Sequence, residues 1–282
     1  MGKLLLFCMQ AAFWLFFIWI LLLCGRKHNG AWQRLSGWRY AHRGLHSKPQ
    51  IPENSLPAFR RAVERGFGAE LDVHLLKDGT LAIIHDSDTE RVTGKKAVVE
   101  DLTLADLEDF RLEGTEEKIP LFDQVLEIFE KEAPLIIELK PYNGNHKELA
   151  EAVCKRLDSY EGDFCLESFD FRCVLAVKKL RPSWCRGQLS YNSLSDPKAK
   201  EKYPWALRFM ATNLLTNVIT TPDFIAYNYP DRKNWSNGLA CRLWGMRRVS
   251  WTLRTMEELK TAEAEKAIAI FEKFDPHTGE TL

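Results

Sequence analysis

Residues 69–86 read AELDVHLLKDGTLAIIHD and contain two strand-like runs joined by a tight turn. Successive side chains of a strand point to opposite faces, and the first run, Ala69–Leu75, alternates accordingly. Between the runs lies Asp78-Gly79, a strong signal for a β-hairpin turn. We therefore predict that Leu81–His85 runs antiparallel to the first run. The hairpin would extend past the rim of a larger sheet and return His85 to that rim.

Further apolar runs recur along the chain, each paired with a helix-like stretch. Eight strand-like runs in alternation with helix-like stretches predict an α/β protein with a closed (β/α)8 barrel, the TIM-barrel fold. Runs such as LIIEL and FIAY fit parallel strands that are covered on both faces. An open doubly wound sheet is the alternative, although no glycine-rich dinucleotide fingerprint supports it. The predicted strands are Arg39–His42, Ala69–His74, Leu135–Leu139, Phe164–Phe169, Gly187–Ser190, Phe224–Asn228, Arg248–Leu253 and Ala267–Phe271.

Amphipathic stretches predict the helices of the barrel. Ser55 is placed to cap the first of them, and Gly66 to end it. A small insertion, about 86–118, interrupts the alternation after the second strand, with a short helix over Leu104–Phe110. The predicted barrel helices are Ser55–Arg65, Phe122–Glu132, Lys147–Leu157, Phe171–Leu180, Tyr203–Thr216 and Met256–Ala264.

The N-terminal segment Leu4–Cys24 is apolar except for Gln10. Its length matches the hydrocarbon core of a bilayer. A cleaved signal peptide would show a shorter apolar stretch and a small-residue cleavage site, and Leu23 stands where a lipoprotein signal needs a small residue. We therefore predict one uncleaved transmembrane helix. The chain then divides into a membrane anchor and linker, residues 1–30, and a barrel domain, residues 31–282.

The charges around this helix predict its orientation. Arg26, Lys27, Arg34 and Arg39 follow it, whereas only Lys3 and the amino terminus precede it. This excess of cations predicts a single-pass membrane protein with its barrel domain on the cytoplasmic side. The seven cysteines form no CxxC pair, and we expect those of the domain to be reduced core residues, which agrees with a reducing compartment.

Composition limits the classes of partner. The chain has 282 residues, of which 45% are hydrophobic and 28% charged, so a substantial folded core is expected. The formal net charge is zero and no nucleic-acid-binding motif occurs, which argues against a nucleic-acid partner. No feature of the sequence indicates an obligate protein partner.

Charged side chains gather at the predicted C-terminal ends of strands, where barrel enzymes hold their reactive groups. Glu70 and Asp72 share one face of a strand, and Glu138 lies on the next barrel strand. Three inward carboxylates repel one another strongly unless a cation lies among them. Carboxylate oxygens suit Mg²⁺ or Ca²⁺ rather than zinc, so we predict one divalent cation. His42 and Lys140 lie at the same ends.

Further fragments accompany this set. They are His42-Arg43-Gly44, Glu53-Asn54-Ser55 with Ala58-Phe59, Gly68-Ala69-Glu70-Leu71-Asp72-Val73, Lys77-Asp78-Gly79, His85-Asp86, Arg91-Val92-Thr93-Gly94, Ile119-Pro120, Glu138-Leu139-Lys140, Ser168-Phe169 and Trp251-Thr252. In this order they resemble the glycerophosphodiester phosphodiesterase family, most specifically before residue 141. The last strand, within Ala264–Phe271, and Phe274-Asp275-Pro276 only approximate the family's C-terminal end.

The resemblance implies hydrolysis of glycerophosphodiesters to glycerol 3-phosphate and an alcohol, in a barrel with an insertion after His85-Asp86. It implies that Glu70, Asp72 and Glu138 hold the metal and that His42 and His85 form the acid–base pair. The attacking group is either water or the neighbouring glycerol hydroxyl. It implies that Arg43 and Lys140 contact the phosphate, that Glu53 binds substrate by a hydrogen bond near the site, and that Trp251 lines the glycerol side of the pocket.

Several alternatives remain open. The membrane helix makes a lysophospholipid a plausible substrate, cleaved at the same site as in a lysophospholipase D, and a glycerophosphate polymer is another. A lyase acting on phosphoinositides or sphingomyelin would use a similar barrel, and a catalytically inactive, membrane-tethered binding protein is the last alternative. Two additional histidines, His46 and His74, are expected to be solvated rather than to take part in the chemistry.

Overall fold

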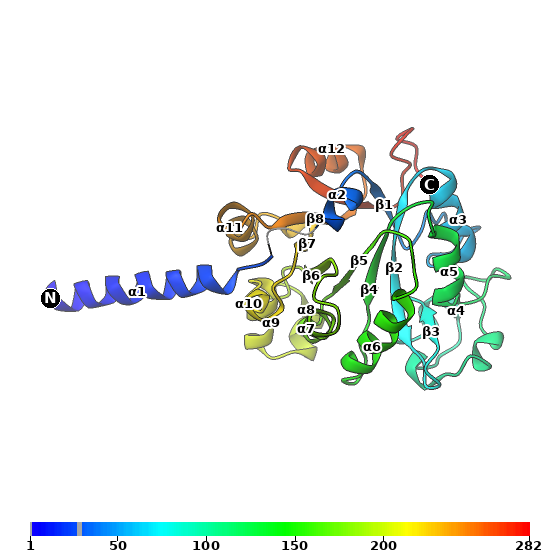
Figure 1. The fold of residues 1–282 in the computed structure, drawn as a ribbon, viewed down its shortest axis with the longest axis horizontal. Helices are drawn as coiled ribbons and strands as arrows, with labels where there is room; N and C mark the ends of the chain where they lie inside the picture. Colours follow the sequence, from blue (N-terminus) through cyan, green and yellow to red (C-terminus); the bar gives the residue numbers. More distant parts are fainter. Residues whose placement is uncertain (1, 27–29) are drawn as a thin grey trace.

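The computed structural model describes residues 2–26 and 30–282, so that residues 27–29 of the predicted linker lie outside the described residues. Helices surround a central group of strands, and α1 projects to one side (Figure 1). The elements are α1 Gly2–Leu22, α2 Ala31–Leu35, β1 Arg39–His42, α3 Leu56–Glu64, β2 Gly68–Leu75, β3 Leu81–Ile83, α4 Glu90–Thr93, η1 Val99–Asp101, η2 Asp106–Asp109, α5 Phe122–Phe129, β4 Leu135–Leu139, α6 His146–Leu157, β5 Phe164–Ser168, α7 Phe171–Leu180, β6 Arg186–Ser190, α8 Pro197–Lys202, α9 Trp205–Thr212, α10 Asn217–Thr220, β7 Phe224–Asn228, η3 Tyr229–Asp231, α11 Trp235–Leu243, β8 Arg247–Leu253, α12 Met256–Ala264 and β9 Ala267–Phe271.

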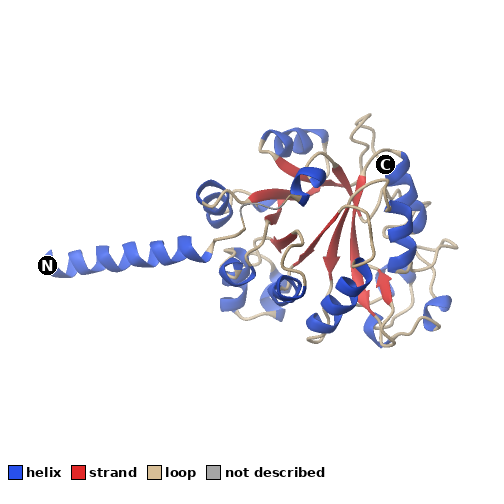
Figure 2. Cartoon of the chain, viewed as in Figure 1, coloured by secondary structure: helices blue, strands red, loops and turns tan. Residues whose placement is uncertain are grey.

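The parallel strands close into a barrel, with helices outside them (Figure 2). Hydrogen bonds join β1, β9, β8, β7, β6, β5, β4 and β2 in that order, and β1 also pairs with β2. The predicted TIM barrel is confirmed, and the open-sheet alternative is wrong because the first and last barrel strands pair directly. Each predicted strand is present, including Ala267–Phe271, which forms β9.

Alternation along the strands creates two cores. Inside the barrel, Tyr40, Ile136 and Phe224 belong to one buried cluster, and Trp32 of α2 contacts Phe224 with ring centroids 5.5 Å apart. A larger cluster fills the space between strands and helices and includes Phe59. On β4 and β5 the inner residues Ile136 and Cys165 are followed two positions later by Glu138 and Glu167, so the packed interior lies beneath these carboxylates.

The predicted hairpin is also confirmed. β3 pairs antiparallel with β2, with Val73 opposite Ile83 and Leu75 opposite Leu81. Gly79 has φ of 89°, a left-handed conformation that glycine adopts without a steric cost. The hairpin therefore projects beyond the barrel strands and carries the chain back toward the rim at His85.

The insertion after β3 has a small core of its own, which includes Val92 and Val99. The helix expected over Leu104–Phe110 is only the short 3₁₀ turn η2. The expectation that His74 is solvated is wrong. Its side chain is buried because the insertion covers β2, and its Nδ1 lies 2.6 Å from Glu100 Oε1 in η1.

The helix predicted over Tyr203–Thr216 is present only as the shorter α9, Trp205–Thr212. Pro204, which lacks an N–H group, precedes α9, and the chain leaves helical geometry again at Leu214, with φ of 57°. A separate short helix, α10, follows at Asn217–Thr220, beyond the predicted range. The separation of α9 and α10 matters because both lie beside the base of α1.

Among the described residues, α1 alone is long and apolar enough to cross a membrane, by length and composition. A signal sequence near an N-terminus passes the same test. The last turns of α1 contact the barrel domain. Trp19 Nε1 donates a hydrogen bond to Ser236 Oγ at 3.0 Å, Trp244 Nε1 donates to the Ile20 carbonyl at 2.8 Å, and Leu23 is fully buried.

Two glycines provide a test of the packing. A Cβ at Gly68 would lie 2.7 Å from the Pro134 carbonyl oxygen and 2.8 Å from the Tyr40 ring, whereas a Cβ at Gly238, inside α11, meets nothing within 4 Å. We expect Gly68→Ala to reduce the free energy of unfolding by about 1–3 kcal/mol through overpacking. Gly238→Ala should raise it by up to about 1 kcal/mol. Urea unfolding of the detergent-solubilised chain measures both, and equal midpoints for the two variants would contradict this packing.

Candidate active site

Three carboxylates converge at the rim of the barrel. β2 and β4 pair in parallel with Asp72 opposite Glu138, and Glu70 shares the face of Asp72. One oxygen atom from each of the three lies within 4.8 Å of the others. Their exposed fractions are 3% for Glu70, 1% for Asp72 and 6% for Glu138. The structure therefore brings together the three residues that the sequence indicated as metal ligands.

The electrostatics of this cluster are unfavourable without added positive charge. Burial, followed by the charges of Asp72 and Glu138, raises the pKa of Glu70 well above its usual range. Burial also raises the pKa of Glu138, although the Lys140 ammonium opposes it. Burial would raise the pKa of Asp72 too, but Lys140 and other nearby cations outweigh it and lower that pKa. A further cation is needed to ionise all three groups together.

Two cationic side chains line the cluster. Lys140 Nζ lies 3.1 Å from Asp72 Oδ1 and 2.8 Å from Glu138 Oε1. Arg43 Nε lies 3.6 Å from Asp72 Oδ2, and the Arg43 backbone N–H donates to Glu70 Oε2 at 3.1 Å. Both residues expected to contact the phosphate therefore lie beside the carboxylates.

Glu53 is surrounded by cations. Its Oε1 accepts from Arg43 Nη1 at 2.7 Å and from Arg91 Nη2 at 2.8 Å, and Lys48 Nζ lies 3.0 Å from its Oε2. Burial would raise the pKa of Glu53, but Arg91 and Arg43 hold that pKa below its usual range. Glu53 thus fixes the Arg43 side chain, while a direct substrate contact stays a prediction.

His42 lies between two acidic groups. Its Nδ1 is 2.8 Å from Glu272 Oε2, and its Nε2 is 3.9 Å from Glu70 Oε2. Burial lowers the pKa of His42 to about 4 against the opposing hydrogen bond to Glu272, so the imidazole is neutral near pH 7. A carboxylate only accepts hydrogen bonds, so Nδ1 carries the proton, and Nε2 is left as the acceptor.

His85 is held in a similar way after the hairpin. Its Nδ1 lies 2.7 Å from Asp86 Oδ1, and Asp86 in turn pairs with Arg91. His85 is near enough to Asp72 and Glu138 that it contributes to the lowered pKa of Asp72 and opposes the raised pKa of Glu138. The two predicted catalytic histidines therefore reach the same cluster from β1 and from the hairpin.

Sequence reasoning missed two acidic residues of this region. Glu167 lies opposite Glu138 on β5, burial raises its pKa well above the usual range, and its Oε2 has no hydrogen-bond partner. The period-two pattern of FCLES, which puts Cys165 and Glu167 on one face, was the available signal. Glu272 immediately follows β9. Its position at the end of a strand was the only feature of the sequence that indicated a place at the site.

An aromatic wall borders the cluster on one side. The Trp251 ring packs edge-to-face against Phe169, with centroids 5.4 Å apart, and Phe169 packs in the same way against Tyr191 at 5.8 Å. Lys140 Nζ lies 5.9 Å from the Phe169 ring centroid. Trp251, expected to line the pocket, is therefore connected to the charged groups through Phe169.

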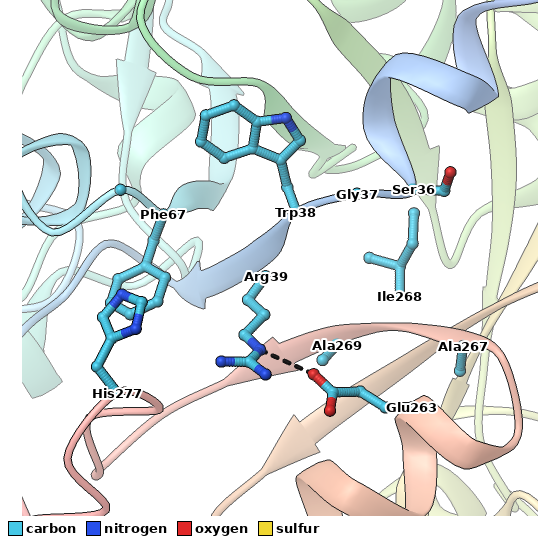
Figure 3. A pocket seen from close by; sticks show the side chains of 11 residues that line it. Ser36, Gly37, Trp38, Arg39, Phe67, Glu263, Ala267, Ile268, Ala269 and His277 are labelled. Atoms are coloured by element: carbon cyan, nitrogen blue, oxygen red, sulfur yellow. Dashed lines mark hydrogen bonds and ion pairs between the residues drawn. The ribbon is translucent and has the colours of Figure 1, made fainter.

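A cavity of about 310 Å³ lies at the opposite end of the barrel, where β1 and β9 begin (Figure 3). Arg39 and Glu263 form an ion pair across it, and His277 stacks on Phe67 with ring centroids 4.7 Å apart. It contains none of the predicted site residues. Since barrel enzymes react at the C-terminal ends of their strands, we assign this cavity no part in the chemistry.

The donor set at the rim fits a hard divalent cation. The ligand atoms are carboxylate oxygens from Glu70, Asp72 and Glu138, and Glu167 adds an unpartnered buried oxygen next to them. Hard oxygen ligands of this kind favour Mg²⁺, Ca²⁺ or Mn²⁺ over metals that prefer sulfur or nitrogen.

A barrel rim that combines buried carboxylates able to hold a cation with two histidines has the groups needed for metal-assisted hydrolysis of a phosphate ester. Residues 42–271 match the model of the glycerophosphoryl diester phosphodiesterase family. The chain belongs to this family and is a phosphodiesterase that hydrolyses glycerophosphodiesters.

Individual relatives agree with this assignment. The chain is 30% identical over 235 residues to a glycerophosphodiester phosphodiesterase of Caldanaerobacter subterraneus subsp. tengcongensis, covering 78% of this chain and 87% of that one. It is 31% identical over 147 residues to the lysophospholipase D GDPD1 of Rattus norvegicus, covering 48% of this chain and 45% of that one. A phosphodiesterase of Oleispira antarctica, solved with the product sn-glycerol-3-phosphate, has the same fold, with a TM-score of 0.68, 22% identity and coverage of 85% and 94%.

Proposed function

We propose that this protein hydrolyses glycerophosphodiesters to glycerol 3-phosphate and an alcohol at the cluster of Glu70, Asp72 and Glu138. The observation that carries the proposal is the convergence of three buried carboxylates within 4.8 Å, beside an imidazole 3.9 Å from one of them. These carboxylates hold one divalent cation, Mg²⁺ or Ca²⁺. When bound, the cation supplies positive charge against the negative charge that grows on the phosphoryl oxygens in the transition state.

The acid and base are His42 and His85. His42 is the stronger candidate for the base because its neutral imidazole presents an unprotonated Nε2 to the cluster. It would take the proton of the attacking group, either water or the glycerol hydroxyl, and His85 would protonate the leaving alcohol. Arg43 and Lys140 bind the phosphate oxygens, and Trp251 lines the glycerol side of the pocket. Glu53 acts on the substrate through Arg43.

Glu272 offers a test of how His42 is oriented. We expect Glu272→Gln to lower kcat by about 10- to 100-fold, with little change in KM, because the amide no longer holds the imidazole in one tautomer. Steady-state kinetics with glycerophosphocholine measure the effect. Glu280→Gln, an exposed change near the C-terminus, should leave kcat unchanged. A Glu272→Gln enzyme with full kcat would show that the hydrogen bond does not position the base.

The substrate is either a soluble glycerophosphodiester or a lysophospholipid presented by a membrane. The second alternative is supported by α1 and by the similarity to a lysophospholipase D over about half of the chain. In both cases the bond cleaved joins the phosphate to the second alcohol, so the same residues serve both reactions.

The membrane anchor and linker, residues 1–30, are retained with α1 as a single membrane-spanning helix, and residues 31–282 form the catalytic domain. Retention of the anchor is supported by contacts between the barrel domain and the residues that follow α1. The Arg26 guanidinium bonds both Asp223 oxygens at 2.6 Å, and Leu23 is fully buried against the domain. Cleavage after Leu23 would remove the buried side chain. The cations that follow α1 favour a cytoplasmic domain.

The activity is tested with the full chain in detergent, each divalent metal, and three substrates: glycerophosphocholine, glycerophosphoethanolamine and lysophosphatidylcholine. We expect release of choline or ethanolamine that stops with chelator and returns with Mg²⁺ or Ca²⁺. The ratio of rates on glycerophosphocholine and lysophosphatidylcholine separates the two substrate classes. Turnover that survives exhaustive chelation would overturn the metal-dependent mechanism.

A further inference from the structure

Large apolar side chains are exposed around the point where α1 reaches the barrel domain. They lie on three neighbouring helices, α9, α10 and α11, and the most exposed are Trp235 at 82% and Trp205 at 61%. We call this surface the stem face. It comprises Trp205, Leu207, Val218, Ile219, Trp235 and Leu243.

Direct contacts tie these helices to the base of α1. Trp205 stacks on Phe209 with centroids 5.0 Å apart, and Phe209 packs against Trp19 of α1 at 5.7 Å. Trp235 precedes Ser236, which accepts the hydrogen bond of Trp19. The exposed tryptophans of α9 and α11 are thus one residue or one ring away from α1.

The remaining members of the stem face lie equally close. Leu243 precedes Trp244, whose Nε1 donates to the Ile20 carbonyl at 2.8 Å. Val218 and Ile219 belong to α10, which contacts α1. In Figure 1, α1 meets the domain between α11 on one side and α9 with α10 on the other. The exposed apolar residues therefore lie on the helices that flank the base of α1.

We propose that the stem face docks onto the surface of the bilayer that α1 spans. The barrel domain then contacts the membrane directly, in addition to its covalent link through α1. This inference rests on the proposed membrane helix. The outer part of α1 is exposed and apolar, so lipid must begin where the contacts with the domain end. Side chains near this point lie at the membrane–water interface. Tryptophan is favoured there because its ring is apolar and its N–H is polar.

The charged residues of α8, beside the stem face, favour a membrane with anionic headgroups. α8 contacts α9 at the edge of the stem face, and it carries three exposed lysines, Lys198, Lys200 and Lys202, against Glu201 within the helix and Asp196 at its N-cap. Basic side chains beside an interfacial surface are attracted to anionic headgroups. Trp235 begins α11, the α-helix that follows β7, and helices of a barrel begin near the C-terminal ends of the strands, so docking brings this part of the rim toward the lipid.

The test uses the full chain, one molecule per nanodisc, so that no second copy can cover the stem face. The nanodisc contains phosphatidylcholine, phosphatidylglycerol and a nitroxide-labelled phosphatidylcholine as quencher. A fluorophore is attached to Trp205→Cys or Trp235→Cys in a Cys8→Ala background, since Cys8 is the exposed cysteine of the described residues. The matched control is Glu127→Cys, exposed on α5 at the far side of the domain in Figure 1. Leu15→Cys reports on α1 itself.

We expect the labels at positions 205 and 235 to be quenched at least about twofold more than the label at 127. Strong quenching at 15 with equal quenching at 205, 235 and 127 would overturn the docked orientation while leaving the membrane helix intact. Absence of quenching at 15 would overturn the membrane helix and the docking together. Neither result would bear on the phosphodiesterase activity, which is measured separately with the soluble substrate glycerophosphocholine.

Discussion

Replacement of His42 or His85 by alanine should lower kcat for glycerophosphocholine by about 10²- to 10⁴-fold, the usual contribution of a positioned acid or base. Each imidazole has its Nδ1 held by a carboxylate, Glu272 for His42 and Asp86 for His85. Nε2 is therefore free in both to exchange a proton with the substrate. Loss of either proton-transfer step is enough to stop turnover, so the double variant should be little worse than each single variant.

The control for this experiment is His277→Ala. His277 stacks on Phe67 and lies at the other end of the barrel, beside the cavity of Figure 3. Its loss should leave kcat unchanged. Circular dichroism and the urea midpoint of each variant verify that the fold is intact. A correctly folded His42→Ala or His85→Ala enzyme with normal kcat would remove that histidine from the mechanism.

Neutral replacements in the carboxylate cluster should abolish cation binding and reduce turnover at least about 100-fold, more than changes outside the ligand set. The variants are Glu70→Gln, Asp72→Asn and Glu138→Gln. In the wild-type chain, a cation at about 100 times its Kd should stabilise the fold by about 2.7 kcal/mol. For a chain of this size that corresponds to a rise in Tm of about 5–10 °C.

The same variants distinguish a cation site from a structural network. Without cation, Glu70→Gln should not lower Tm, because it removes one of the charges that burial and its neighbours disfavour. With Mg²⁺ or Ca²⁺, the Tm of each variant should stay where it was. Glu263→Gln, in the ion pair at the opposite end, should keep the full cation-induced rise. A cation-induced rise that persists in Glu70→Gln and Asp72→Asn would contradict the assignment of the ligands.

The barrel and most of its site could be predicted because their signals are local. A short apolar run that alternates with helix-like stretches indicates a buried parallel strand, and the spacing of Glu70 and Asp72 gives a shared face before any tertiary contact is known. The Asp78-Gly79 turn likewise specifies the hairpin from two residues.

The features that could not be predicted depend on long-range contacts. Glu272 meets His42 only because closure of the barrel brings β9 beside β1, across 230 positions of sequence. The burial of His74 requires the insertion to fold back over β2, which its polar sequence does not indicate. The stem face could not be predicted for the same reason, since α9, α10 and α11 become neighbours of α1 only in the folded chain.

The most direct test is the anomalous diffraction of crystals of the full chain soaked in Mn²⁺, an ion that suits carboxylate oxygens. We expect one strong manganese peak bonded to Glu70, Asp72 and Glu138, with the imidazoles of His42 and His85 beside it. A peak bonded to other residues, or crystals with no peak at the rim of the barrel, would contradict a cation site built from these three carboxylates.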